Sequence, residues 1–162
     1  MTIRLLTGIL LLATSLTAGG QRDLLAQTAS TSNSQRGASV QKGTVKITIR
    51  VNGKTVSATV LDNLTARDFV FLLPLNLSLS DLFGREKQGS LPRALSEKGP
   101  RTQGYEVGDI GYWSPGHDIA VYYHKDGELI PSPGIIPIAR IDAGAEVFKV
   151  AGSVDVAIEI AK

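Results

Sequence analysis

The fold is decided by residues 45–60, which read VKITIRVNGKTVSATV. Apolar and polar side chains alternate on both sides of the Asn-Gly pair at 52–53, as they do in strands with one buried face. Asn-Gly tolerates the positive φ angles of a type I′ turn, so this stretch predicts a β-hairpin. The turn sets Ile49 opposite Val56, so that two apolar side chains are paired. The turn therefore predicts the same strand register as the hydrophobic alternation.

The remainder of the sequence predicts further short strands and little helix. Residues 62–68 begin a helix with Thr65 as the N-cap, and the helix ends before Pro74. Strands are predicted at 75–80, 109–113, 118–124, 134–141 and 153–160. Residues 84–108 show no sustained period and predict a long irregular loop. Together these elements favour a mainly β fold, a closed antiparallel barrel.

The N-terminus has the order of a secretory signal peptide. Arg4 precedes an apolar run over 5–16, and small residues follow at 18–20. The run is shorter than the roughly 20 residues that span a bilayer. We expect residues 1–20 to be a cleaved signal peptide, with an uncleaved anchor as the alternative. We therefore expect a bacterial protein that is exported, periplasmic or secreted, without a membrane span after cleavage and without a lipid anchor.

Composition divides the rest of the chain into a linker and one domain. Residues 21–43 are rich in Ser, Thr, Gln, Gly and Ala, which predicts a flexible polar linker. The folded domain is then 44–162, about 120 residues, a usual size for one domain. The 162-residue chain has 17 basic and 15 acidic residues, a net charge of +2 that gives no support to a nucleic-acid partner. It has no cysteine, which excludes disulfides and thiolate sites. The oligomeric state is left open.

Seven segments in chain order resemble one family. They are the hairpin 45–60, LDNLTARDF at 61–69, LLPL at 72–75, LPR at 91–93, GDIGYW at 108–113, AVYY at 120–123 and IARID at 138–142. The domain resembles small prokaryotic proteins of the cyclophilin-like family, which implies a closed barrel of about eight strands with short helices. True cyclophilins isomerise X-Pro bonds, but their motif Phe-His-Arg followed by Phe-Met-Ile-Gln-Gly-Gly-Asp is absent. The resemblance therefore transfers no catalytic residue.

The aromatic residues with polar tips gather in one part of the sequence. They are Tyr105, Tyr112, Trp113, Tyr122 and Tyr123. Such rings suit both a core and a ligand pocket, because each has an apolar body and a hydrogen-bonding tip. We expect Trp113, Tyr112 and Tyr105 to line a groove for a peptide or small molecule. Tyr122 and Tyr123 are expected to fill the barrel.

Three further residues complete the predicted ligand site: His117, Arg93 and Arg140. A planar guanidinium suits a ligand carboxylate or amide carbonyl. The alternative for Arg140 is an ion pair with Asp142 at the barrel rim, and the alternative for His117 is a surface turn. His117 and His124 are an odd number of residues apart, which points them to opposite faces of one strand. We therefore expect no metal and no cofactor.

These observations favour an exported binding module that holds a peptide or small molecule in an aromatic groove without catalysis. The alternative is an extracytoplasmic peptidyl-prolyl isomerase, in which Arg93 or Arg140 polarises the prolyl amide. A third interpretation is a domain that binds a protein partner.

Overall fold

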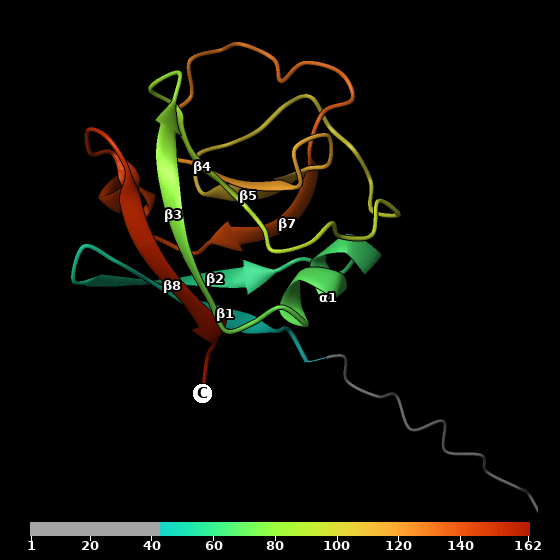
Figure 1. Cartoon of the computed structure of the whole chain (residues 1–162), viewed down its shortest axis with the longest axis horizontal. Coiled ribbons are helices and arrows are strands. Elements are labelled where there is room, and N and C mark those ends of the chain that lie inside the picture. The colour runs from blue at the N-terminus through green and yellow to red at the C-terminus, as the bar shows by residue number, and fades with distance from the viewer. Residues whose placement is uncertain (1–42) are drawn as a thin grey trace, which may run out of the picture. The chain divides into compact units, whose positions relative to one another are not determined.

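The computed structural model describes residues 43–162. The predicted signal peptide 1–20 lies outside the described residues, as does all of the predicted linker 21–43 except Gly43. In the described part, eight antiparallel strands close into a barrel in the order β1-β2-β7-β5-β6-β4-β3-β8 (Figure 1). The predicted fold class is confirmed. No helix among residues 43–162 is long and apolar enough to cross a membrane.

The strands are short and the helices few. The strands are β1 (Lys46–Val51), β2 (Lys54–Val60), β3 (Leu75–Leu82), β4 (Glu86–Ser90), β5 (Asp109–Trp113), β6 (Asp118–Tyr122), β7 (Ile136–Ile141) and β8 (Val154–Ile160). The remaining elements are the helix α1 (Leu64–Val70) and a 3-10 helix, η1 (Ala145–Phe148).

The hairpin β1–β2 has the predicted turn and register. Ile49 pairs with Val56 and Val51 with Lys54. The turn residue Asn52 has a φ of 49°, a left-handed conformation that Asn adopts more readily than most residues. Turn chemistry and hydrophobic alternation point to the same pairing, so the local sequence alone specifies it.

Strand β4 corrects the prediction of an irregular loop over 84–108. Residues 86–90 pair with β3 on one side and β6 on the other. The sequence EKQGS has no apolar residue, so hydrophobic alternation could not show it. Its inward residue is a lysine, Lys87, with no exposed surface.

The predicted N-cap of α1 is also wrong by two residues. Asn63 is the N-cap, and its side chain accepts a hydrogen bond of 2.9 Å from the Ala66 amide. Thr65 is buried instead, and its hydroxyl donates to the Ser96 carbonyl at 2.6 Å. Asn is as good a cap as Thr, and the tertiary contact decides where each side chain goes.

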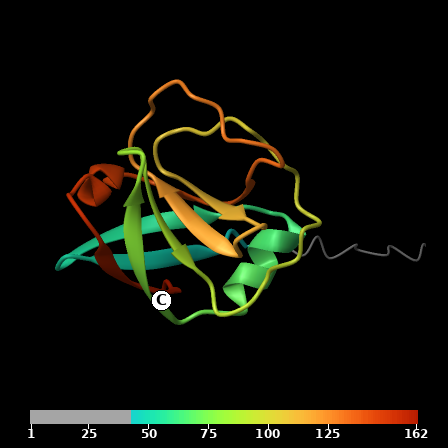
Figure 2. The ribbon, with the colours of Figure 1, turned by 45° about the horizontal axis from the view of Figure 1, so that its top comes forward.

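The apolar core has two parts. The larger one fills the barrel, and α1 and η1 each contribute to it a phenylalanine with no exposed surface, Phe69 and Phe148. These two helices lie on opposite sides of the barrel (Figure 2). The smaller cluster, which includes Tyr105, Tyr122 and Ile135, lies apart from the first. Because strand residues alternate between faces, this second cluster covers the outside of the barrel wall.

Candidate functional site

The site is built on the outer face of β4, β6 and β5. The register places Glu86 beside Tyr122, and Gln88 beside Ala120. Successive side chains on a strand point to opposite faces, so these four share the outer one. On β5, Trp113 joins them at the strand end and is half-buried.

Residues 124–135 cover this face. In Figure 1 the segment arches, in orange, on the side of β4 and β5. Ile130 and Ile135 are buried against the outer cluster. Gly111 of β5 permits the approach, because a Cβ there would lie 2.6 Å from the Ile135 Cδ1 atom. The cover and the strands together enclose a pocket of about 190 Å³.

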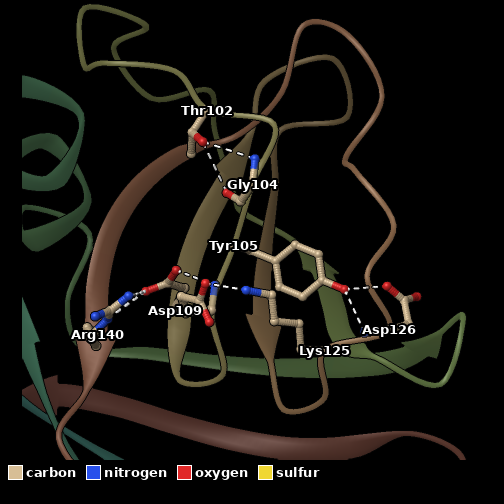
Figure 3. A network of polar contacts seen from close by, with 8 residues as sticks. Thr102, Gly104, Tyr105, Asp109, Lys125, Asp126 and Arg140 are labelled. Atoms are coloured by element: carbon tan, nitrogen blue, oxygen red, sulfur yellow. Dashed lines mark hydrogen bonds and ion pairs between the residues drawn. The ribbon is translucent and has the colours of Figure 1, made fainter.

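The walls of the pocket are largely apolar. They include Phe83, Trp113, Ala120, Tyr122, Ile130 and Ile135. Behind the wall, Tyr105 stacks on Tyr122 with ring centroids 4.3 Å apart. The Tyr105 hydroxyl donates to Asp126 at 2.7 Å, which ties the cover to the barrel (Figure 3). Ring, cover and strand therefore hold one another in place.

Two adjacent charged residues line the pocket and are buried. Arg85 is 6% exposed and Glu86 5% exposed. Their Nε and Oε2 atoms are 3.9 Å apart, too far for a hydrogen bond. Neither atom has a hydrogen-bond partner in the part of the chain that the structure describes. Buried polar atoms are nearly always partnered, so this pair is unusual.

Aromatic rings and one carboxylate hold the Arg85 guanidinium. Its central carbon lies 5.1 Å from the centroid of the Phe83 ring and 5.5 Å from that of Tyr105. Its Nη1 is 3.5 Å from Asp126, a weak contact. These neighbours stabilise the cation but leave the Nε–H donor unused.

Burial sets the protonation of the site. Desolvation raises the pKa of Glu86 above its ordinary value, while the Tyr122 hydroxyl and the Arg85 guanidinium act in the opposite direction. Burial and the neighbouring Glu86 carboxyl also raise the pKa of Tyr122. The Tyr105 hydroxyl holds the pKa of Asp126 below its ordinary value. Tyr122 therefore stays neutral across the physiological range.

The structure brings together only two of the predicted ligand residues. Trp113 lines the pocket, and Tyr105 supports it through the stacked Tyr122 ring. Tyr112 lies in the barrel interior with no exposed surface, where its hydroxyl accepts a hydrogen bond of 3.1 Å from the Leu95 amide. It does not line the pocket.

The other predicted site residues are on the surface, away from the pocket lining. Arg93 pairs with Asp68 at 2.6 Å. Arg140 pairs with Asp109 at 2.7 Å (Figure 3). His117 is an exposed turn residue with a φ of 56°.

The expected rim pair between Arg140 and Asp142 is wrong. The two residues share a face of the β7 region, but Asp142 pairs instead with Lys46 at 2.8 Å. Arg140 pairs with a carboxylate of the neighbouring strand β5, and Asp142 with a lysine of β1, so spacing along one strand does not reveal either pair.

Sequence reasoning missed Arg85, Glu86 and Gln88, because β4 itself was missed. It also placed both Tyr122 and Tyr123 in the barrel, whereas Tyr123 lies inside and Tyr122 lies on the outer face. One signal was available. Gly84 lies a few residues after the predicted strand 75–80, and a glycine at such a place is compatible with a turn and a returning strand.

The fold and the pocket together define a small antiparallel barrel with a hollow of about 190 Å³ on its outer wall. A model of the cyclophilin-like family matches residues 49–159, and the chain belongs to that family. Among solved structures, the solution structure of a hypothetical protein from Archaeoglobus fulgidus is similar, with a TM-score of 0.59 and 22% identity. The match covers 73% of this chain and 95% of that one, and it shows a shared fold. No curated protein matches the chain.

Proposed function

We propose that the protein binds a small molecule, or one side chain of a peptide, in the pocket between β4, β6, β5 and the cover, without transforming it. The observation that carries this proposal is a buried arginine with an unused donor in the wall of an apolar cavity. Burying such a donor unpaired costs free energy that a ligand acceptor would recover.

The size of the pocket limits the ligand. At about 190 Å³ it is below the roughly 300–1,000 Å³ of pockets that hold drug-sized molecules. Larger hollows exist, such as one of about 550 Å³ beside the β1–β2 turn, but its charged residues Arg50 and Asp155 are exposed. The pocket on the outer wall therefore suits a single ring or a short side chain.

Trp113 reports on this pocket, because it is the only tryptophan of the chain and part of the wall. We expect members of a panel of metabolites and short peptides to change its fluorescence with saturation. Ala120→Leu, which fills the pocket from the outer face of β6, is expected to abolish the response. Ala143→Leu, at an exposed position, is the matched control and is expected to bind normally.

Two results would overturn the binding proposal. One is a panel without any saturable response. The other is a response that Ala120→Leu leaves unchanged while circular dichroism shows the variant to be folded.

Peptidyl-prolyl isomerisation is the second candidate. The pocket holds an arginine and a glutamine, two residue types of the cyclophilin motif, although not in that motif's sequence. Arg85, rather than Arg93 or Arg140, would then polarise the amide. An assay on X-Pro peptides decides: acceleration that Arg85→Ala removes supports the isomerase, and no acceleration at micromolar protein excludes it.

We also propose that the mature domain acts outside the cytoplasm. The order of Arg4, the apolar run 5–16 and the small residues 18–20 supports this. We expect the extracytoplasmic fraction of a bacterial host to contain a product whose measured mass is that of a chain beginning at residue 21. A chain without residues 2–20 is the control and is expected to stay inside. A full-length mass in the cytoplasm would contradict the proposal.

A further inference from the structure

We propose that the ligand is recognised through a primary carboxamide or a lactam, whose carbonyl accepts from Arg85 Nε–H and whose N–H donates to Glu86 Oε2. This inference rests on the proposed function, because it assigns the chemical group that enters the same pocket.

Two atoms of the site are without hydrogen-bond partners within residues 43–162, and one of them is a donor and the other an acceptor. Arg85 Nε–H can only donate, and an ionised Glu86 oxygen can only accept. Both belong to side chains that are more than nine-tenths buried and that line the pocket. They lie 3.9 Å apart, a span that one small group can bridge once it displaces the side chains that cover the two atoms.

Other polar side chains near the pocket already have hydrogen-bond partners. Gln88 donates its amide N–H to Asp118 at 2.8 Å, and Ser90 donates to the same carboxylate at 2.7 Å. The Tyr105 hydroxyl donates to Asp126. Arg85 and Glu86 are thus the pair whose hydrogen bonding a ligand would complete.

The ligand group must also have a suitable shape. An amide presents its N–H and C=O on one edge only when the hydrogen lies on the same side as the oxygen, as in a carboxamide or a lactam. The trans peptide bond places them on opposite sides. A prolyl amide has no N–H and would leave Glu86 unpaired. A peptide backbone therefore does not fit, whereas an Asn or Gln side chain does.

Charge leads to the same choice. Arg85 already faces two carboxylates, Asp126 at 3.5 Å and Glu86 at 3.9 Å, so a neutral group adds no further negative charge to the site. A carboxylate ligand would pair with Arg85 but would lie against the Glu86 carboxylate. The site thus favours a neutral donor–acceptor group over an anion.

Benzamide, N,N-dimethylbenzamide and benzoate test the inference on the unmodified full chain. They share a phenyl ring, but only benzamide offers a donor and an acceptor on one edge. Binding is followed by Trp113 fluorescence and by the NMR resonance of Arg85 Nε–H. We expect benzamide to bind at least about tenfold more tightly than either analogue, since an unmade buried hydrogen bond costs about 1–3 kcal/mol.

A variant tests the acceptor separately. Glu86→Gln can present an N–H where the carboxylate was, so we expect the preference for benzamide over benzoate to fall by about tenfold or to invert. Glu159→Gln is the matched control, because the Glu159 carboxylate pairs with Arg50 away from the pocket. It is expected to leave the preference unchanged.

The outcomes separate this inference from the proposed function. Equal binding of all three probes, abolished by Ala120→Leu, overturns the carboxamide assignment and leaves the proposed pocket function standing. Tightest binding of benzoate also overturns it, because the site would then be a simple anion site. If none of the three probes binds, the carboxamide assignment is overturned as well. The panel of metabolites and peptides, followed by Trp113 fluorescence, then tests the proposed function independently.

Discussion

At the scale of single residues, Lys87 shows how a charged side chain can lie inside an apolar barrel. Its ammonium has no exposed surface, and it donates to Asp81 at 2.8 Å and to the carbonyls of Val150 and Gly152 at 2.5 and 2.6 Å. Burying a charge is costly unless every donor finds a partner, and here each of the three does. The side chain thereby ties β4 to β3 and to the segment before β8.

We expect Asp81→Asn to lower the free energy of unfolding by about 3 kcal/mol at neutral pH, because it removes the only anionic partner among these acceptors. Urea unfolding, followed by circular dichroism, measures the loss. Asp155→Asn, at an exposed position on β8, is the matched control and is expected to change little. Equal stability of Asp81→Asn and the unmodified protein would contradict the role of the pair.

The same pair predicts a dependence on pH. The hydrogen bonds from Lys87 and Tyr123 hold the pKa of Asp81 below its ordinary value. A lowered folded pKa contributes stability above the unfolded pKa of about 4, and this contribution is lost as the pH falls further. We expect the unmodified protein to lose more stability between neutral pH and pH of about 3 than Asp81→Asn does. Parallel pH profiles of the two proteins would contradict this.

At the scale of elements, the pocket forms because the cover 124–135 lies over the outer face of the barrel wall. It rests on β5 through Ile135, whose side chain packs directly over Gly111. The Ile135 N–H donates to the Thr102 carbonyl, and the Ile135 carbonyl accepts from the Thr102 N–H, both at 2.9 Å. The cover is therefore held against the barrel wall at its C-terminal end.

Gly111→Ala tests this arrangement. The added methyl group would overlap Ile135, and overpacking of this kind costs about 1–3 kcal/mol. We expect a lower unfolding midpoint and a red-shifted Trp113 emission, because the displaced cover exposes the pocket wall. Gly43→Ala, where nothing lies within 4 Å of the added Cβ, is the control. Unchanged emission in Gly111→Ala would show that the cover does not depend on this contact.

The sequence predicts the elements in which apolar and polar residues alternate regularly. It does not predict an element that consists of polar residues. The hairpin 45–60 and the strands β5 and β6 follow from alternation and turn chemistry. Strand β4 does not, because the partners of Lys87 come from distant carbonyls that no local pattern encodes. The prediction of the site was affected most, because Glu86 lies on that strand and Arg85 lies beside it.

At the scale of the whole molecule, every strand has two neighbours within residues 43–162. The barrel therefore leaves no open edge for another strand to complete. We expect a chain that begins at residue 43 to unfold within about 2 °C of the full chain in thermal scans, because 1 kcal/mol corresponds to several degrees. A larger drop would show that residues 1–42 contribute to the stability of the barrel.

The place of β8 between β1 and β3 has a consequence for the order of folding. Ile47, near the start of the domain, pairs with Ile160, and Leu75 pairs with Ile158. The last strand to be synthesised thus joins two of the first, and contacts so distant in sequence form slowly. A nascent chain cannot complete this wall until residues 154–160 have been made. The wall between β1 and β3 therefore stays unpaired until late in the synthesis of the domain.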